Sequence, residues 1–195
     1  MTEIWNQRYA QDTYVYGIEP NEFYKEQLSK LHPGKILFPA EGEGRNAVYA
    51  ALNGWEVTAF DSSQEAKKKA ERLATEKEVK LEYHISSIEN IEFEENSFDA
   101  IVLVYVHTEN RHENHRKLLR FLKPGGTLIL EGFSKKQLSN NSGGPRNLDM
   151  LFSIEELNSD FKSLNEINIS ESEIELNEGN LHIGKAAVIR IVAKK

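Results

Sequence analysis

Hydrophobic positions in this chain form short runs separated by stretches with helical spacing. The run at 98–104 is nearly continuous and β-rich, as is typical of a strand buried on both faces of a sheet. The same criterion predicts strands over 35–39, 56–60, 80–85, 98–104 and 127–133. The intervening apolar spacing predicts helices over 45–53, 64–77 and 111–122. Strands that alternate with helices imply a parallel sheet with right-handed crossovers.

The two ends of the chain add further elements. Residues 2–10 read as a short polar helix, and Asn21 is a plausible N-cap for a helix that Pro33-Gly34 ends. Near the C-terminus, two strands at about 163–176 and 181–193 flank a turn signal at 177–180. We therefore expect the sheet to close with an antiparallel hairpin.

Composition narrows the class of protein. The chain has 195 residues, 39% hydrophobic and 28% charged, which suits one globular domain. A net charge of −7 repels a phosphate backbone, so no nucleic-acid partner is expected. The absence of cysteine excludes disulfides and cysteine-ligated metals. No apolar run is long enough for a membrane span and no signal-peptide core is present, so a cytoplasmic protein is expected.

The segment 35–47 carries the clearest chemical signal. An apolar run ends in a loop with Gly42 and Gly44, a helix-forming stretch follows, and the next apolar run ends at Asp61. In open α/β sheets this arrangement binds a nucleoside, because glycines admit the ligand, the helix N-terminus offers N–H groups and the acid accepts the ribose hydroxyls. A dinucleotide and S-adenosylmethionine both fit such a site.

Three features favour S-adenosylmethionine over a dinucleotide. The G-x-G-x-x-A match at 42–47 is weak alone, and Glu41 and Glu43 place carboxylates where a pyrophosphate would sit. The Lys-Pro-Gly-Gly turn at 123–126 and the terminal hairpin have no role in a dinucleotide domain. The chain is also too short for a second, substrate-binding domain.

With these motifs the chain resembles class I S-adenosylmethionine-dependent methyltransferases. Within that class it is similar to small bacterial TehB-like (tellurite-resistance) and thiopurine-methyltransferase-like enzymes, through residues 5–9, 16–17, 44–46, 131–133 and 149–152. The resemblance implies a Rossmann-like, doubly wound α/β fold. Its sheet has seven strands in the order 3-2-1-4-5-7-6, with strand 7 antiparallel, inside a three-layer sandwich. One domain over 1–195 would comprise a helical lid (1–34), a cofactor-binding core (35–133) and an acceptor-side loop with the hairpin (134–195).

The chain departs from the family pattern at three positions. Phe38 stands where the family has an acid, Ala40 replaces a glycine, and Ser87 stands where an acid often holds the adenine amino group. These departures keep open a second hypothesis, a non-catalytic domain that binds the cofactor or has lost it. A nicotinamide-dependent oxidoreductase is the less favoured third hypothesis.

The resemblance assigns a cofactor role to a set of residues along the sheet edge. Asp61 would accept the ribose hydroxyls, or alternatively cap the next helix; Ser87 and Ile88 would flank adenine, or lie in a plain loop. Glu41 is also a candidate partner for the cofactor ammonium. The full set of predicted cofactor-binding residues is Tyr16, Ala40, Glu41, Gly42, Gly44, Asn46, Asp61, Ser62, Ser87, Ile88 and Val104.

Candidates for the acceptor side are fewer. His107 follows the fourth strand and is the best candidate for a general base, because an unperturbed histidine titrates near neutrality; the alternative is a loop histidine that caps the next helix. Trp5, Tyr9 and Tyr16 form either a lid or simple packing. In the tail, Arg146, Asp149, Glu178 and His182 border the expected acceptor pocket but are more often structural. His112 and His115 have metal-pair spacing without an obvious third ligand, so no metal is predicted.

The catalytic motifs that the chain lacks narrow the class of methyl acceptor. Strand four is not followed by the Asp/Asn-Pro-Pro-aromatic motif that amino-group methylation of adenine or glutamine uses, and no cysteine is available for pyrimidine C5-methylation. We therefore expect methyl transfer from S-adenosylmethionine to a small-molecule acceptor. Soft nucleophiles such as thiols, selenium and tellurium oxyanions are favoured because they need little or no base. The oligomeric state is left open.

Overall fold

The computed structural model describes residues 2–195, and its centre is one seven-stranded sheet of order β3-β2-β1-β4-β5-β7-β6. Strands β1 to β5 run parallel, whereas β7 pairs antiparallel with both β5 and β6. The predicted strand order and the antiparallel strand 7 are confirmed. The strands are β1 (Lys35–Pro39), β2 (Glu56–Asp61), β3 (Glu82–Ile85), β4 (Phe98–Val104), β5 (Leu122–Phe133), β6 (Asn165–Glu178) and β7 (His182–Lys194).

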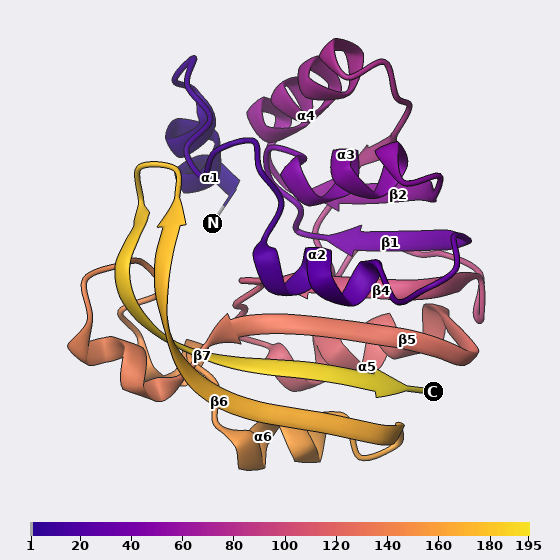
Figure 1. Cartoon of the computed structure of the whole chain (residues 1–195), viewed down its shortest axis with the longest axis vertical. Helices are drawn as coiled ribbons and strands as arrows, with labels where there is room; N and C mark the ends of the chain where they lie inside the picture. The colour runs from indigo at the N-terminus through magenta and orange to yellow at the C-terminus, as the bar shows by residue number, and fades with distance from the viewer. Residues whose placement is uncertain (1) are drawn as a thin grey trace.

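Helices cover both faces of this sheet, which confirms the three-layer arrangement (Figure 1). The helices are α1 (Thr2–Tyr9), α2 (Glu22–Leu28), α3 (Arg45–Leu52), α4 (Gln64–Glu76), α5 (Arg111–Phe121) and α6 (Ile154–Asp160). Alternation along β1 sends Ile36 and Phe38 to the face under α2, α3 and α4, and Leu37 to the face under α5 and α6. Short 3-10 turns cover Lys135–Ser139 and Leu148–Met150.

Two connections differ from the elements predicted from the sequence. Residues 123–126, expected as a turn, belong to β5, which begins at Leu122 and pairs irregularly with β4 before a regular register starts at Thr127. The two 3-10 turns lie in a stretch expected to be loop, because isolated turns leave no periodic pattern. None of the helices in the described chain combines the length and apolar character that a membrane crossing requires.

The N-terminal segment is not one structural unit. Tyr24 and Leu28 of α2 are buried in the core against β1, and Asn21 caps α2 by accepting from Tyr24 N. Helix α1 instead contacts α4, and the segment between α1 and α2 meets the tip of the β6–β7 hairpin, where Asn180 N donates to Val15 O at 2.9 Å. Figure 1 shows this hairpin tip beside α1. Met1 of the predicted 1–34 lid lies outside the described residues.

Candidate functional site

A cavity of about 390 Å³ opens at the carboxyl ends of the parallel strands. This is the sheet edge where open α/β proteins bind ligands, and the volume lies in the range of small-molecule sites. The structure brings most of the predicted site residues to its wall. Those that line it are Tyr16, Ala40, Glu41, Asn46, Asp61, Ser62, Ser87, Ile88, Val104 and His107.

Asp61, the last residue of β2, is held as a hydrogen-bond acceptor. Its Oδ2 accepts from Gly42 N at 3.1 Å and its Oδ1 from Ser63 N at 2.8 Å. Burial raises the pKa of Asp61, against the lowering effect of these N–H groups. Each carboxylate oxygen keeps a second lone pair, which suits a ribose diol. The helix cap that was the alternative role for Asp61 is provided by Ser63, whose hydroxyl accepts from Ala66 N.

Glu41 follows β1 and presents one free oxygen. Its Oε1 accepts from Asn46 N at 2.9 Å and from Ala47 N at 2.8 Å, which satisfies the N-terminus of α3. No partner for Oε2 occurs among residues 2–195. Burial raises the pKa of Glu41 to about 7, more than the N–H groups of Ala47 and Asn46 lower it. An acceptor of this kind at a cavity wall fits a cationic ligand group.

The two predicted loop glycines have a different role from the one expected. Neither Gly42 nor Gly44 lines the cavity; both have positive φ, and a Cβ on Gly44 would lie 2.6 Å from Ala70 Cβ of α4. A Cβ on Gly42 would lie 2.8 Å from Tyr9 Oη. Gly44 therefore permits close packing of α3 on α4, rather than close approach of a ligand.

Glu43, which the sequence analysis placed beside a ligand pyrophosphate, does not line the cavity. Its side chain turns away from the cavity and pairs with Lys69 at 2.6 Å, both groups being buried. Its Oε2 also accepts from Val15 N at 2.8 Å, so it holds the N-terminal segment to the glycine loop. Of the two glutamates in the loop, Glu41 lines the cavity and Glu43 does not, so the argument from the loop against a pyrophosphate rests on Glu41.

The prediction that His107 is a general base is wrong. Its Nδ1 donates to Met150 O at 2.7 Å, so Nε2 is the acceptor, and Phe133 N donates to it at 3.0 Å. The ring stacks between Phe133 and Phe152, and burial lowers its pKa to about 4. Both nitrogens are occupied, so His107 joins β5 to the 148–150 turn rather than accepting a proton. The alternative of a helix cap does not describe it either.

The N-terminal aromatic residues line the cavity on its α1 side. Trp5, Tyr9 and Tyr16 all face it, as does Arg8. Trp5 and Tyr9 stack with ring centroids 5.6 Å apart, and Arg8 lies 4.6 Å above the Trp5 ring and donates to Tyr16 Oη at 3.0 Å. The aromatic groups predicted as a lid therefore lie at the cavity and also pack on one another, so both roles suit them.

Residues from distant parts of the chain complete the opposite wall, among them His182, which the sequence analysis expected beside the acceptor pocket. Tyr105 and Phe133 stack with centroids 4.6 Å apart, and His182 from β7 meets both rings edge-on. Glu131 is buried beneath them and accepts from Tyr105 Oη at 2.7 Å. No local motif marks this wall, because β4, β5 and β7 supply it from distant parts of the chain. The remaining lining residues are Thr2, Arg45, Phe60, Ser86, Glu89, Val106, Thr108, Gly144, Pro145 and Met150.

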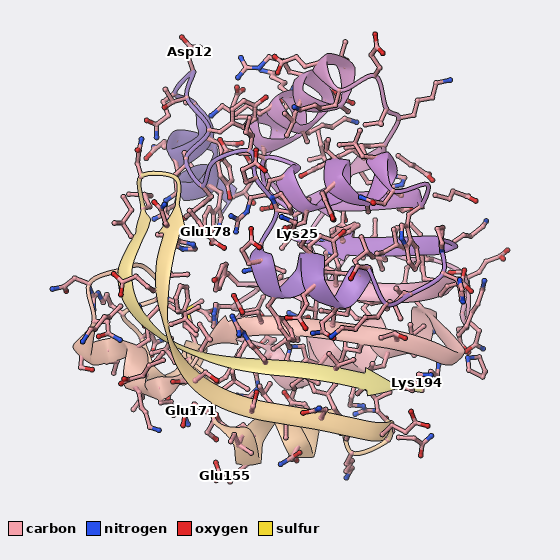
Figure 2. All side chains as sticks on the ribbon, in the orientation of Figure 1. Asp12, Lys25, Glu155, Glu171, Glu178 and Lys194 are labelled. Carbon is pink, nitrogen blue, oxygen red and sulfur yellow. The ribbon has the colours of Figure 1, made fainter. Side chains whose placement is uncertain are left out.

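The other candidates from the tail lie in different places. Glu178 pairs with Arg45 at 2.9 Å and lies on the side of the hairpin that faces the N-terminal half of the molecule (Figure 2). Arg146 donates to Asn140 O and Asn141 Oδ1 in its own loop, and neither it nor Asp149 lines the cavity. His112 and His115 both bond to Asp160 of α6.

Comparison with known proteins supports this description. Residues 39–130 match the family described as "Methyltransferase domain". The ubiquinone biosynthesis O-methyltransferase of Rickettsia akari is 32% identical over 114 residues, which cover 57% of this chain and 44% of that protein. The chain thus spans about half the length of the curated relatives it matches.

Two solved structures share the fold. TehB from Haemophilus influenzae superposes with a TM-score of 0.70 at 18% identity, over 100% of this chain and 66% of that one. A protein from Methanosarcina mazei described as a SAM-dependent methyltransferase superposes with a TM-score of 0.71 at 21% identity, over 90% and 99% of the two chains.

The sheet order and the cavity position define a methyltransferase fold of the Rossmann-like kind. Over residues 39–130 the chain matches a methyltransferase domain, and its fold is that of class I S-adenosylmethionine-dependent methyltransferases. S-adenosylmethionine is the cofactor of this class, as the sequence predicted.

Proposed function

We propose that this protein transfers a methyl group from S-adenosylmethionine to a small-molecule acceptor. The observation that carries the proposal is the pairing, in one cavity, of the Asp61 carboxylate with the unpartnered Oε2 of Glu41. Asp61 would bind the ribose hydroxyls, Glu41 the ammonium group, and Ser87 with Ile88 the adenine. When bound, S-adenosylmethionine supplies an activated methyl group with a good leaving group.

The chain's own contribution is orientation and exclusion of water. Trp5, Tyr9 and Tyr16 form an apolar wall on one side, and Tyr105 with Phe133 forms another. Such walls hold the acceptor in line with the methyl group and keep water from competing, which are the main means of accelerating this displacement.

A soft nucleophile remains the favoured acceptor. With both nitrogens of His107 bonded, that residue cannot deprotonate an acceptor, so an acceptor that ionises readily near neutral pH suits the site. Thiols and the oxyanions of selenium and tellurium have this property. A TehB-like specificity is part of this proposal, and the shared fold with TehB is consistent with it.

A phenolic hydroxyl is the second candidate acceptor. The curated relatives are named as ubiquinone biosynthesis O-methyltransferases, and they match about half of their length here. The aromatic pair Tyr105 and Phe133 offers a surface on which an aromatic acceptor stacks.

The test is formation of S-adenosylhomocysteine in the presence of 2-mercaptoethanol, selenite, tellurite or catechol. We expect turnover with at least one of these, loss of it in Asp61→Asn, and wild-type rates in Glu56→Gln, which alters an exposed carboxylate at the other end of the same strand. Turnover with catechol alone would favour the phenolic candidate. Binding of S-adenosylmethionine without turnover on any acceptor would favour a non-catalytic domain.

A further inference from the structure

His182, the first residue of β7, has a fixed ring orientation. Its Nδ1 lies 3.2 Å from Glu178 Oε2 across the hairpin turn. Burial by itself raises the pKa of Glu178, but the hydrogen bond from His182 and the charge of Arg45 outweigh it and hold that pKa at about 2. Glu178 is therefore ionised and can only accept, so Nδ1 carries the proton and Nε2 of the neutral ring carries a lone pair.

The Nε2 atom belongs to a ring in the cavity wall and keeps a free lone pair. The ring lines the cavity wall, and Nε2 has no hydrogen-bond partner within residues 2–195. No buried side-chain nitrogen or oxygen in that part of the chain lacks a partner, so Nε2 is an accessible atom. Gly143 keeps space beside it, since a Cβ there would lie 2.9 Å from Nε2. His107 differs, because both of its ring nitrogens have hydrogen-bond partners.

The groups packed around His182 act on its pKa in both directions, and burial has the largest effect. Burial lowers the pKa of His182, and Glu178 of β6 opposes this, whereas Arg45 of α3 and Arg8 of α1 add to it. Tyr16 faces the ring at 4.5 Å between centroids and Tyr105 at 4.7 Å, and both phenol pKa values are raised by burial, so neither is charged. His107 is the remaining titratable neighbour, and burial keeps it neutral too.

Position along the sheet separates the two ends of the cavity. Asp61 ends β2, Ser62 follows it, and Ser87 and Ile88 come after β3, all at one end of the strand order. The wall around His182 comes from β4, β5 and β7, on the other side of β1. A nucleoside held over β2 and β3 leaves the β4–β5–β7 end for the acceptor.

We propose that His182 is the acceptor-side general base of this site and that Glu178 is the residue that positions it. The assignment rests on the proposed methyl transfer and specifies its acceptor, which carries a dissociable proton on sulfur or oxygen. The acceptor lone pair forms the bond to the methyl carbon, the methyl–sulfur bond breaks with its electrons going to sulfur, and the acceptor proton goes to Nε2 and then to water.

The first test needs no acceptor. In ¹⁵N NMR of the protein bound to S-adenosylhomocysteine, neutral His182, assigned by its loss in His182→Gln, should show a protonated Nδ1 and an unprotonated Nε2. The ring should take up a proton reversibly with a pKa below 6.5, and Glu178→Gln should lower that pKa further. A proton on Nε2 of the neutral ring, or a ring that never titrates while the protein is folded, overturns the assignment.

The second test is kinetic, with 2-mercaptoethanol and catechol as acceptors. His182→Gln should lower kcat by about 10²-fold or more and leave S-adenosylhomocysteine binding intact, and added imidazole should restore part of the rate in His182→Ala. His84→Gln, which changes a histidine on β3 away from the cavity, should match wild type. Unchanged kcat in His182→Gln contradicts the base role. If wild type methylates neither acceptor, the proposed function fails for both, and the nitrogen shifts alone decide the state of His182.

Discussion

Glu41 and Glu178 are two largely buried carboxylates whose pKa values are shifted in opposite directions. Glu41 lies in the cavity wall, and Glu178 lies behind the wall, against its residues Arg45 and His182. Burial raises the pKa of Glu41 to about 7, because its partners are two uncharged backbone N–H groups. Burial pushes the pKa of Glu178 upward as well, but His182 and Arg45 hold it at about 2. Glu41 can therefore accept a cationic group at the cofactor end. Glu178 stays ionised at the acceptor end and orients His182.

The two ends also differ in how the chain builds them. Glu41 bonds to residues five and six positions along the chain, whereas Arg45 and Glu178 are 133 positions apart. A local loop creates the cofactor end, and the hairpin must dock on α3 to create the acceptor end. Changes that weaken the hairpin should therefore harm the acceptor end first.

The largest expected effect comes from breaking the acceptor-end pair. Glu178→Gln leaves the guanidinium of Arg45 buried without its anion, and we expect a loss of about 3–5 kcal/mol in the free energy of unfolding. Urea unfolding at pH 7 measures it, with Glu175→Gln, an exposed acid on the same strand, as the control. Equal small losses in both variants would show that the hairpin contact contributes little.

The second-largest expected effect comes from the packing of α3 on α4 beneath the cofactor end. Gly44→Ala places a Cβ 2.6 Å from Ala70 Cβ at a positive φ, and we expect a loss of about 2–4 kcal/mol from overpacking and backbone strain together. Gly125→Ala shares the positive φ but meets nothing within 4 Å, so it should cost only about 1–2 kcal/mol. Thermal unfolding of the two variants separates the cost of overpacking from the cost of backbone strain. Equal losses would show that Gly44 has no packing role.

The pH dependence of stability should have opposite signs at the two ends. The raised pKa of Glu41 means that its contribution is full below about pH 4.5 and falls as pH rises toward 7. The depressed pKa of Glu178 means that its contribution is full above about pH 4.5 and falls as pH drops toward 2.

Removing the charge of Glu41 tests this difference. Glu41→Gln should raise the Tm at pH 8 and leave it nearly unchanged at pH 4.5, an effect on the order of 1 kcal/mol, because the amide oxygen still accepts from the α3 N–H groups. Calorimetric melting at the two pH values measures it without ligand. A lower Tm at pH 8 would show that the ionised carboxylate stabilises the empty site.

The smallest expected effect is at Ala40, which has a φ of 49°. Ala40→Gly relieves about 1–2 kcal/mol of left-handed strain, but the added chain entropy of glycine offsets roughly 0.5–1 kcal/mol of it. We expect a gain of at most about 1 kcal/mol by urea unfolding. Ala51→Gly inside α3, where no strain is relieved, should instead lose about 1 kcal/mol.

The cofactor end could be predicted from sequence because its signals are local. Strand β1, the glycine loop and Asp61 lie within 27 residues, and hydrophobic alternation places each on the sheet edge. The sequence could not show where Glu43 points, since its partner Lys69 is on another helix. It also could not show that Gly44 meets Ala70, a contact made only when α3 packs on α4.

The acceptor end could not be predicted because its contacts join distant segments. His107 looked like a base from its position after β4, and only the docking of β5 and the 148–150 turn occupies both of its nitrogens. His182 was one of four tail residues expected to border the acceptor pocket, and only the hairpin pairing sets it against Glu178 and the aromatic wall. Strand order was predictable, whereas the side chains that meet across it were not.

The most direct test of the central claim is titration calorimetry with S-adenosylmethionine, S-adenosylhomocysteine and oxidised NAD in parallel. We expect both adenosyl-sulfur ligands to bind and NAD not to bind, Asp61→Asn to weaken binding at least about tenfold, and Glu56→Gln to leave it unchanged. Binding of NAD alone, or of none of the three by folded wild-type protein, would contradict the assignment of this cavity to S-adenosylmethionine.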